Sequence, residues 1–184
     1  MPTLTLIKNS GLITQAHHAP SPNVDLRPDP DDISLLVIHN ISLPPGQFGG
    51  GEICALFCNQ LDSTQHPFFS EIEGLKVSAH LLIDRQGKLT QFVPFHKRAW
   101  HAGNSCFSGR EQCNDYAIGI ELEGTDNTPY TEAQYAMLTD VTTLIMQYYP
   151  AITSERITGH ETISPGRKTD PGPTFDWERY LGKL

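Results

Sequence analysis

The sequence contains no apolar segment long enough to cross a membrane. Its longest aliphatic runs, such as Leu35–Ile38, are far shorter than the roughly 20 residues that a spanning helix needs. The first residues, Met1–Ser10, also lack the basic segment followed by a sustained apolar stretch that marks a secretory signal. We therefore expect no membrane partner, and a chain that stays in the cytoplasm where it is made.

Positive charge is also scarce in this sequence. The 13 Lys and Arg residues are outnumbered by 21 Asp and Glu residues, which gives a formal net charge of −8. Nucleic acids and anionic membranes are bound by basic faces. We therefore expect no nucleic-acid partner, and an anionic small substrate would need a local basic pocket.

Closely spaced cysteine pairs are missing too. The four cysteines, Cys54, Cys58, Cys106 and Cys113, form no C-x-x-C motif, which argues against a structural zinc knuckle. Cys54 and Cys58 would share one face of a helix. We interpret all four as small thiols of a reducing cytosol, buried in the fold.

The chain has no internal repeats and no low-complexity tracts. Its 184 residues are enough for one domain with one core, so we predict a single domain spanning residues 1–184 and a monomer. Residues 1–32 are rich in Pro, Asp and Asn and predict an extended N-terminal arm packed on that domain.

Hydrophobic patterning predicts several strands. A continuous aliphatic run indicates a buried strand that ends at His39, and alternation indicates further strands around a hairpin turn at Asp84–Gly87. The predicted strands are Leu35–Ile38, Val77–Ile83, Leu89–Val93 and Ala117–Leu122.

The clearest predicted helix begins after Thr131. Thr131 and Gln134 form a capping box, Tyr130 can pack on Tyr135, and Pro150 ends the helix. Two shorter helices are predicted at Glu52–Leu61 and Trp177–Leu181. Together these elements predict an α/β (α+β) fold, with a central mixed β-sheet flanked by helices.

Three residues predict a metal site. His39 and His160 both fall where an ordered element gives way to a loop, and Asp170 lies in a Pro- and Gly-rich segment, residues 168–173, that fixes its backbone. Two imidazoles and one carboxylate with an open fourth position form the ligand set of a catalytic zinc site. Each histidine alone is also compatible with a packed or surface imidazole.

A hydrolytic zinc site needs a base for its water and a cation for the oxyanion. Glu121 lies on an otherwise apolar strand and would be half-buried there, and a buried glutamate needs a partner or a function. Lys168 lies two residues before Asp170 and would project beside the metal. For each residue, the alternative is a solvated surface charge.

Six segments of this sequence, in order and over most of the chain, resemble the AmpD-type N-acetyl-anhydromuramyl-L-alanine amidases of the wider zinc amidase and peptidoglycan-recognition fold. The segments are 36–46, 77–80, 98–103, 118–125, 158–160 and 167–173.

The resemblance implies that His39, His160 and Asp170 hold Zn²⁺, with Glu121 as the general base and Lys168 as the oxyanion stabiliser. It also implies that Asn40 and Trp100 line the cleft for the substrate, a small anhydromuramyl peptide. The implied function is cleavage of the lactyl-amide bond to L-alanine in cytoplasmic peptidoglycan recycling. Loss of such enzymes is linked to β-lactamase regulation in some species.

Some positions depart from the family pattern. Residues 161–166 read Glu-Thr-Ile-Ser-Pro-Gly, where relatives commonly carry Cys-Asp/Asn-Ile-Ala-Pro-Glu, and Gln112 and Lys76 stand where some relatives have arginines. Lys76 is therefore only a weak candidate for substrate binding. We expect a structural role for His80, and we expect His101 to shape the cleft rather than bind metal.

Two alternatives to a cytoplasmic recycling amidase remain open. A peptidoglycan-binding module of the same fold without activity is disfavoured because all three proposed ligands are present. An exported or phage-type amidase would keep the chemistry and act on polymeric wall.

Overall fold

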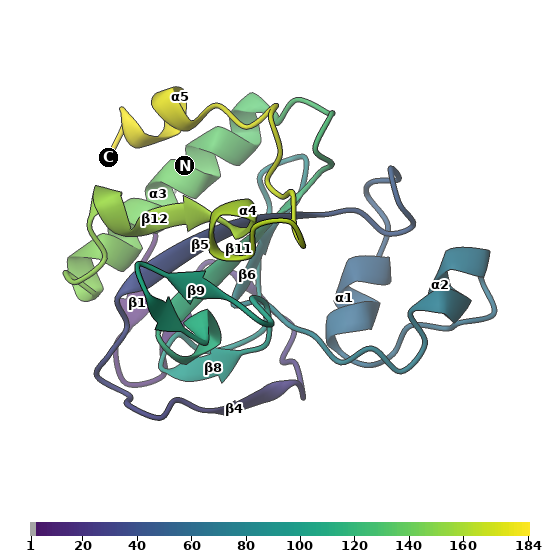
Figure 1. The fold of residues 1–184 in the computed structure, drawn as a ribbon, viewed down its shortest axis with the longest axis horizontal. Helices are drawn as coiled ribbons and strands as arrows, with labels where there is room; N and C mark the ends of the chain where they lie inside the picture. The colour runs from purple at the N-terminus through teal and green to yellow at the C-terminus, as the bar shows by residue number, and fades with distance from the viewer. Residues whose placement is uncertain (1–2) are drawn as a thin grey trace.

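The computed structural model describes residues 3–184 (Figure 1). The strands are β1 (Leu6–Ile7), β2 (Leu12–Ile13), β3 (His17–His18), β4 (Val24–Leu26), β5 (Leu35–Ile41), β6 (Leu81–Ile83), β7 (Leu89–Gln91), β8 (Lys97–Ala99), β9 (Cys106–Phe107), β10 (Arg110–Glu111), β11 (Ala117–Glu123) and β12 (Ile157–Gly159). The helices are α1 (Glu52–Phe57), α2 (Pro67–Glu71), η1 (Cys113–Asp115), α3 (Glu132–Tyr148), η2 (Ser154–Arg156), α4 (His160–Ile163) and α5 (Trp177–Leu181).

A six-stranded mixed sheet forms the centre of the molecule, in the order β12-β5-β11-β6-β7-β3. The four strands from β12 to β6 run parallel, and β7 pairs antiparallel to β6. Helices α3 and α5 lie together on one side, while α1 and α2 stand apart at the other end of the molecule (Figure 1). The predicted mixed sheet flanked by helices is therefore confirmed.

The long central strands β5 and β11 are buried on both faces, which explains their continuous aliphatic sequences. Leu36, Ile38, Ile118 and Ile120 belong to the main core that includes the apolar stripe of α3. On the opposite face, Leu35, Val37 and Ala117 join a smaller core with Tyr116 and Ile163. The same face carries His39 and Glu121, which lie directly opposite each other in the β5–β11 register.

Helix α3 begins as its sequence predicts. The Thr131 hydroxyl accepts a hydrogen bond from the Gln134 N–H at 3.1 Å, and the Gln134 side chain accepts one from the Thr131 N–H at 3.1 Å. The rings of Tyr130 and Tyr135 meet edge to face with their centroids 6.3 Å apart. The hairpin turn at Asp84–Gly87 is confirmed by the antiparallel pairing of β6 and β7.

Several predicted boundaries were wrong. The strand predicted at Val77–Ile83 is regular only over Leu81–Ile83, and at its predicted start the Ser78 N–H donates to the Trp100 carbonyl, outside the central sheet. Helix α1 ends at Phe57 rather than Leu61. Asn59 adopts the left-handed conformation, with a φ of 57°, and its N–H donates to the Leu56 carbonyl, so the helix does not continue. The edge strand β12, with only three residues, is too short to give a periodic signal.

Residues 3–32 contact several parts of the domain. Strand β3 extends the central sheet beside β7, and β4 pairs antiparallel with β8. Ile13 is fully buried in the main core. Arg27 is also buried, and its guanidinium donates to the carbonyls of Phe95 and Ala117.

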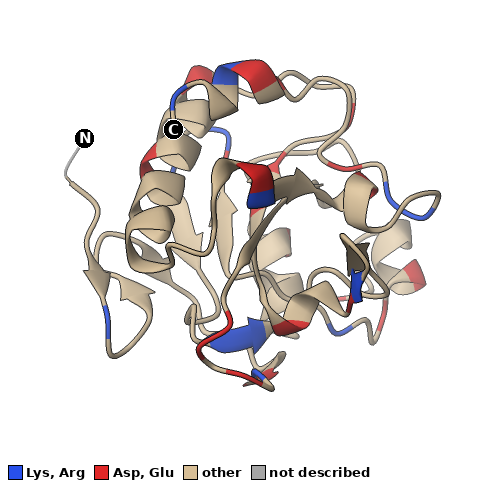
Figure 2. Cartoon of the chain, turned by 60° about the vertical axis from the view of Figure 1, so that its left-hand side comes forward, with Lys and Arg blue, Asp and Glu red and all other residues tan. Residues whose placement is uncertain are grey.

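Acidic and basic residues are interspersed over the ribbon rather than gathered on one face (Figure 2). Across residues 3–184, the structure contains no helix with the length and apolar character that crossing a membrane requires.

Candidate active site

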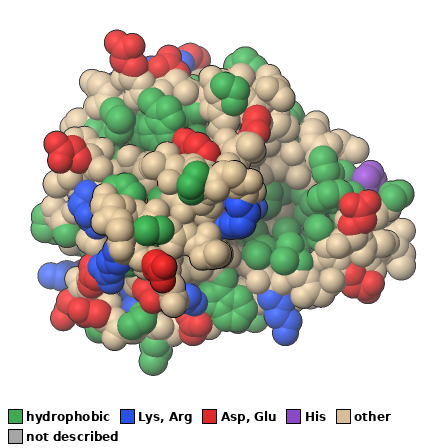
Figure 3. All heavy atoms as spheres, in the orientation of Figure 1, with side chains coloured by type: hydrophobic (Ala, Val, Ile, Leu, Met, Phe, Trp, Pro, Cys, Tyr) green, Lys and Arg blue, Asp and Glu red, His purple; other side chains and the backbone are tan. Residues whose placement is uncertain are grey.

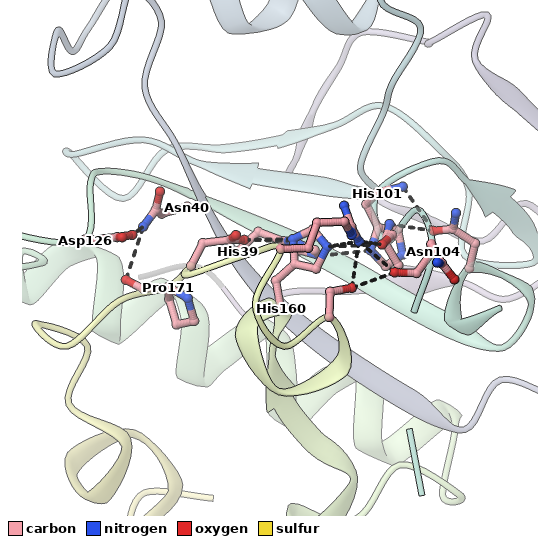
Figure 4. Close-up of polar contacts among 12 residues, drawn as sticks. His39, Asn40, His101, Asn104, Asp126, His160 and Pro171 are labelled. Carbon is pink, nitrogen blue, oxygen red and sulfur yellow. Dashed lines mark hydrogen bonds and ion pairs between the residues drawn. The ribbon is translucent and has the colours of Figure 1, made fainter. Parts of the chain in front are cut away.

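Three side chains from separate parts of the chain converge at the carboxyl ends of the parallel strands. His39 lies near the end of β5, His160 follows β12 as the first residue of α4, and Asp170 lies in the loop before α5. The Nδ1 atoms of the two imidazoles are 3.0 Å apart, and Asp170 Oδ2 lies 3.1 Å from His39 Nδ1 and 3.0 Å from His160 Nδ1 (Figure 4). All three residues are at least nine-tenths buried. The structure thus brings the predicted set together.

The outer nitrogens of both imidazoles have their own partners. His160 Nε2 lies 3.1 Å from the Ala102 carbonyl oxygen, which can only accept, so Nε2 carries a proton and Nδ1 is the nitrogen that can bind a metal through its lone pair. His39 Nε2 lies 2.9 Å from His101 Nδ1. When His39 donates in this contact, its Nδ1 also presents a lone pair to the centre of the group.

The electrostatics of this group fit a metal cation. Burial lowers the pKa of His39 to about 4, so its ring is neutral near pH 7. Two inward lone pairs and one carboxylate repel one another at 3 Å, and a bound cation removes that repulsion.

Glu121 lies beside this group on β11. The residue is only 8% exposed, which is more buried than the sequence predicts, and its Oε2 has no hydrogen-bond partner within residues 3–184. Burial, followed by the negative charge of Asp170, raises its pKa well above the usual value. A carboxylate with a raised pKa and a free oxygen is suited to accepting a proton.

A cavity of about 290 Å³ opens onto these residues. One side is polar and includes Glu121, Lys168 and Asp170, and Lys168 is exposed to solvent. The other side is apolar, with Trp100 and residues of α1, α2 and the segments beside them. Figure 3 shows the hollow bordered by hydrophobic side chains on the side of α1 and α2. The apolar lining residues are Ile41, Leu43, Leu56, Phe57, Phe68, Ile72, Leu75, Val77 and Trp100.

The predicted substrate contacts are not all in this cavity. Asn40 and Trp100 line it, although the Asn40 amide also donates to Asp126 Oδ1 at 2.9 Å and to the Pro171 carbonyl at 3.2 Å. Asn40 thereby fixes the loop that carries Asp170. Lys76 is absent from the cavity and lines a smaller neighbouring pocket.

Sequence reasoning missed the residues that surround the three converging side chains. Arg167 donates to the carbonyls of Ala102 and Asn104 at 2.7 and 2.8 Å, which connects the loop after α4 to the segment after β8. The buried Asn114 contacts the same segment. Arg167 directly precedes Lys168, so its place in the sequence could have suggested that it lies near the site. Nothing in the sequence around Asn114 suggests this, and only the fold brings it there.

Comparisons with known proteins agree with this geometry. Residues 29–173 match the family model described as N-acetylmuramoyl-L-alanine amidase. The chain is 58% identical over 174 residues to the 1,6-anhydro-N-acetylmuramyl-L-alanine amidase AmpD of Haemophilus influenzae, covering 95% of each chain.

Two solved structures extend the comparison. A selenomethionine derivative of AmpD is 55% identical, with a TM-score of 0.93 and coverage of 95% of this chain and 97% of that chain. AmiD of Escherichia coli, solved with anhydro-N-acetylmuramic acid-L-Ala-D-γ-Glu-L-Lys as substrate, is 28% identical with a TM-score of 0.61. That match covers 83% of this chain and 57% of the AmiD chain.

Proposed function

Because this chain belongs to the N-acetylmuramoyl-L-alanine amidase family, we propose that it hydrolyses 1,6-anhydromuramyl peptides during peptidoglycan recycling. The bond cleaved is the amide between the lactyl group of 1,6-anhydro-N-acetylmuramic acid and the L-alanine of the stem peptide. The name of a relative that is 58% identical over 95% of both chains supports this substrate.

One observation carries the proposal. Three electron-pair donors, His39 Nδ1, His160 Nδ1 and an Asp170 oxygen, meet within 3.1 Å of one another. The cavity beside them is also lined by an acid without a partner, Glu121, and by a lysine, Lys168. Amide hydrolysis by a metal site requires a base, a cation and a metal-binding group, and all three surround this cavity.

We propose that His39, His160 and Asp170 hold Zn²⁺, which prefers nitrogen and oxygen ligands of this kind. Bound zinc supplies a Lewis acid that polarises a carbonyl and acidifies water. A set of three protein ligands leaves a further position open, as in catalytic rather than structural zinc sites.

The chain's own residues would move the protons. The Glu121 carboxylate accepts a proton from the attacking water as the new C–O bond forms at the lactyl carbonyl carbon. The same proton then passes to the alanine nitrogen as the C–N bond breaks, which releases a carboxylic acid and a free amine. The acid then gives its proton to the amine, so no further reactant is needed. The Lys168 ammonium, exposed at the cavity, stabilises the negative charge on the carbonyl oxygen during this step.

The two sides of the cavity suggest how the substrate is held. The flat indole of Trp100 and its apolar neighbours suit the sugar ring and the peptide backbone, and Asn40 lies on the polar side. The pocket that includes Lys76 shares Leu56, Ile72 and Leu75 with this cavity. We therefore keep Lys76 as a candidate contact for a more distant, anionic part of the stem peptide.

We also propose that the protein works as a cytoplasmic monomer. All four cysteines lie in the described part of the chain and are free, which is the usual state of cysteines in a reducing compartment. The chain matches AmpD over 95% of the length of both proteins.

The test is a comparison of two substrates. Purified protein is offered soluble anhydromuramyl tripeptide and, in parallel, intact sacculi, and the products are identified by mass spectrometry. We expect free anhydro-N-acetylmuramic acid and free peptide from the soluble substrate, with far slower release from sacculi. Equal turnover of both substrates would instead indicate a wall-degrading amidase, and binding without any cleavage would indicate a non-catalytic module.

A further inference from the structure

At its outer nitrogen, each imidazole of the proposed metal site contacts one of two adjacent residues. His39 Nε2 lies 2.9 Å from Nδ1 of His101, and His160 Nε2 lies 3.1 Å from the carbonyl oxygen of Ala102. Figure 4 shows His39 and His160 side by side, with the His101 side chain next to them. The orientation of two ligands that come from β5 and α4 therefore depends on one dipeptide, His101–Ala102.

The backbone of this dipeptide is held by a single side chain. Asn114 Oδ1 accepts hydrogen bonds from the N–H of His101 at 3.0 Å and from the N–H of Ala102 at 2.8 Å. Since both partners are backbone donors, the atom facing them must be the carboxamide oxygen. Asn114 is only 6% exposed and sits in η1, directly before β11, so its position is coupled to the strand that carries Glu121.

Packing fixes the His101 ring as well as its backbone. The ring lies against Gly119 in the middle of β11, where a Cβ atom would come within 2.5 Å of His101 Cγ and Nδ1. Any side chain at position 119 would displace the ring from its contact with His39. On the other side of the dipeptide, Arg167 donates to the Ala102 carbonyl at 2.7 Å, so this oxygen bonds both Arg167 and His160.

We propose that the His101–Ala102 dipeptide, fixed by Asn114, orients both metal-binding histidines, which makes Asn114 and His101 positioning residues of the metal site. The inference rests on the proposed function, because it assumes that His39 and His160 hold the metal. Asn114 is not itself among the residues that line the cavity, and it contacts the lining through the backbone of His101.

The hydrogen-bond directions follow from this arrangement. For His39 to present its Nδ1 lone pair inward, its Nε2 must donate to His101 Nδ1, so His101 carries its proton on Nε2. For His160 the Ala102 carbonyl enforces the same orientation. The dipeptide thus provides one side-chain acceptor and one backbone acceptor. Outer partners of this kind typically change metal affinity by about 10–100-fold when they are removed.

The experiment measures the zinc Kd by competition with a chromogenic chelator, together with the visible spectrum of the Co²⁺-substituted protein. At similar volume, Asn114→Leu removes the oxygen that holds the backbone of the dipeptide, and His101→Leu removes the side-chain acceptor that faces His39. Asn114→Asp keeps an oxygen acceptor at position 114. His101→Asn places a carboxamide oxygen close to where the Nδ1 atom of His101 lies. The matched control is Gln91→Leu, because Gln91 is also a buried carboxamide whose oxygen accepts a backbone N–H, that of Ile13, and it is outside the cavity lining.

We expect both leucine variants to bind zinc about 10–100-fold more weakly and to show a changed Co²⁺ spectrum. Asn114→Asp and His101→Asn should recover most of the affinity. Gln91→Leu should lower the melting temperature of the metal-free protein and leave the zinc Kd unchanged.

Two kinds of failure are distinguishable in this experiment. If the unsubstituted protein binds no zinc, the proposed function is wrong. If it binds zinc and the two leucine variants bind it as tightly, the inference about the dipeptide is wrong. The inference also fails if Asn114→Asp is as weak as Asn114→Leu, because the oxygen acceptor is then not the feature that matters.

Discussion

The buried histidines His39 and His160 differ from the buried His80 in what their nitrogens face. His80 has hydrogen-bond partners at both nitrogens: Nδ1 accepts from the Gly119 N–H at 3.0 Å, and Nε2 lies 3.1 Å from the Lys97 carbonyl oxygen and 3.2 Å from an Arg27 nitrogen. His39 and His160 instead direct their Nδ1 atoms at each other and at a carboxylate.

Burial does not separate the two groups. It lowers the pKa of His39 and that of His80 alike, and both residues are almost fully buried. The difference lies in hydrogen-bond satisfaction, because His80 completes its bonds within the fold whereas the three site residues bring acceptors together without a donor. A metal site is thus recognised by acceptors that face one another and need a cation. Changes at His39, His160 or Asp170 should therefore affect zinc binding, and changes at His80 should affect stability.

The largest expected effect is at the metal-binding set. His39→Ala, His160→Ala and Asp170→Ala each remove one of three protein ligands. Zinc content and activity should fall together, with activity lost by on the order of a hundredfold or more. Zinc per chain and the rate of anhydromuropeptide cleavage check this for each variant. A variant that loses its zinc and stays fully active would remove the link between metal and chemistry.

The next effect is on chemistry alone. Glu121→Gln and Lys168→Ala should keep one zinc per chain while kcat falls by roughly 10²–10³-fold, the cost of removing one transition-state stabiliser in comparable sites. Glu121→Gln should also keep or raise the melting temperature, because it replaces a buried acid that has no partner. Release of zinc from Glu121→Gln would show that Glu121 is a ligand, and full activity in Lys168→Ala would show that Lys168 is only a solvated neighbour.

A smaller effect is expected on substrate binding. Trp100→Ala removes the flat apolar surface from one side of the cavity and should raise KM by roughly tenfold, which corresponds to about 1.4 kcal/mol. The zinc content should not change. Steady-state kinetics with the soluble muropeptide measure both constants, and an unchanged KM would assign Trp100 to packing alone.

The smallest effect on zinc is expected at His80. His80→Leu leaves the Gly119 N–H and the Lys97 carbonyl without their partner, at a cost of about 1–3 kcal/mol each in the free energy of unfolding. His80→Asn can keep one of these bonds and should lose less stability. Denaturant unfolding and the zinc Kd are measured together. A loss of zinc affinity as large as that of His39→Ala would erase the distinction between the two groups.

The sequence predicts the parts of the fold that local rules determine. The capping box at Thr131 defines the start of α3, and the aliphatic runs of β5 and β11 identify the central strands. The convergence of His39, His160 and Asp170 was also predicted, because each falls at the end of an element or in a constrained loop. The short elements β12 and α4 gave no periodic signal, although they place His160.

What surrounds the site could not be predicted in the same way. Asn114 and His101 act through contacts with residues 12 or 13 and 62 positions away in the chain, and no local pattern reports such contacts. The burial of Glu121 was underestimated, because residues far away in the sequence cover the face of β11 that carries it. Lys76 was assigned by resemblance alone, and the fold places it in a neighbouring pocket.

The central claim is that the three acceptors enclose one zinc ion that the reaction requires. The most direct measurement strips the protein of metal with a chelator and adds back Zn²⁺ in known amounts, following bound zinc and anhydromuropeptide cleavage in the same samples. We predict no activity without metal and a linear recovery that saturates at one zinc per chain. Full activity in the metal-free protein, or saturation without recovery of activity, would contradict the account.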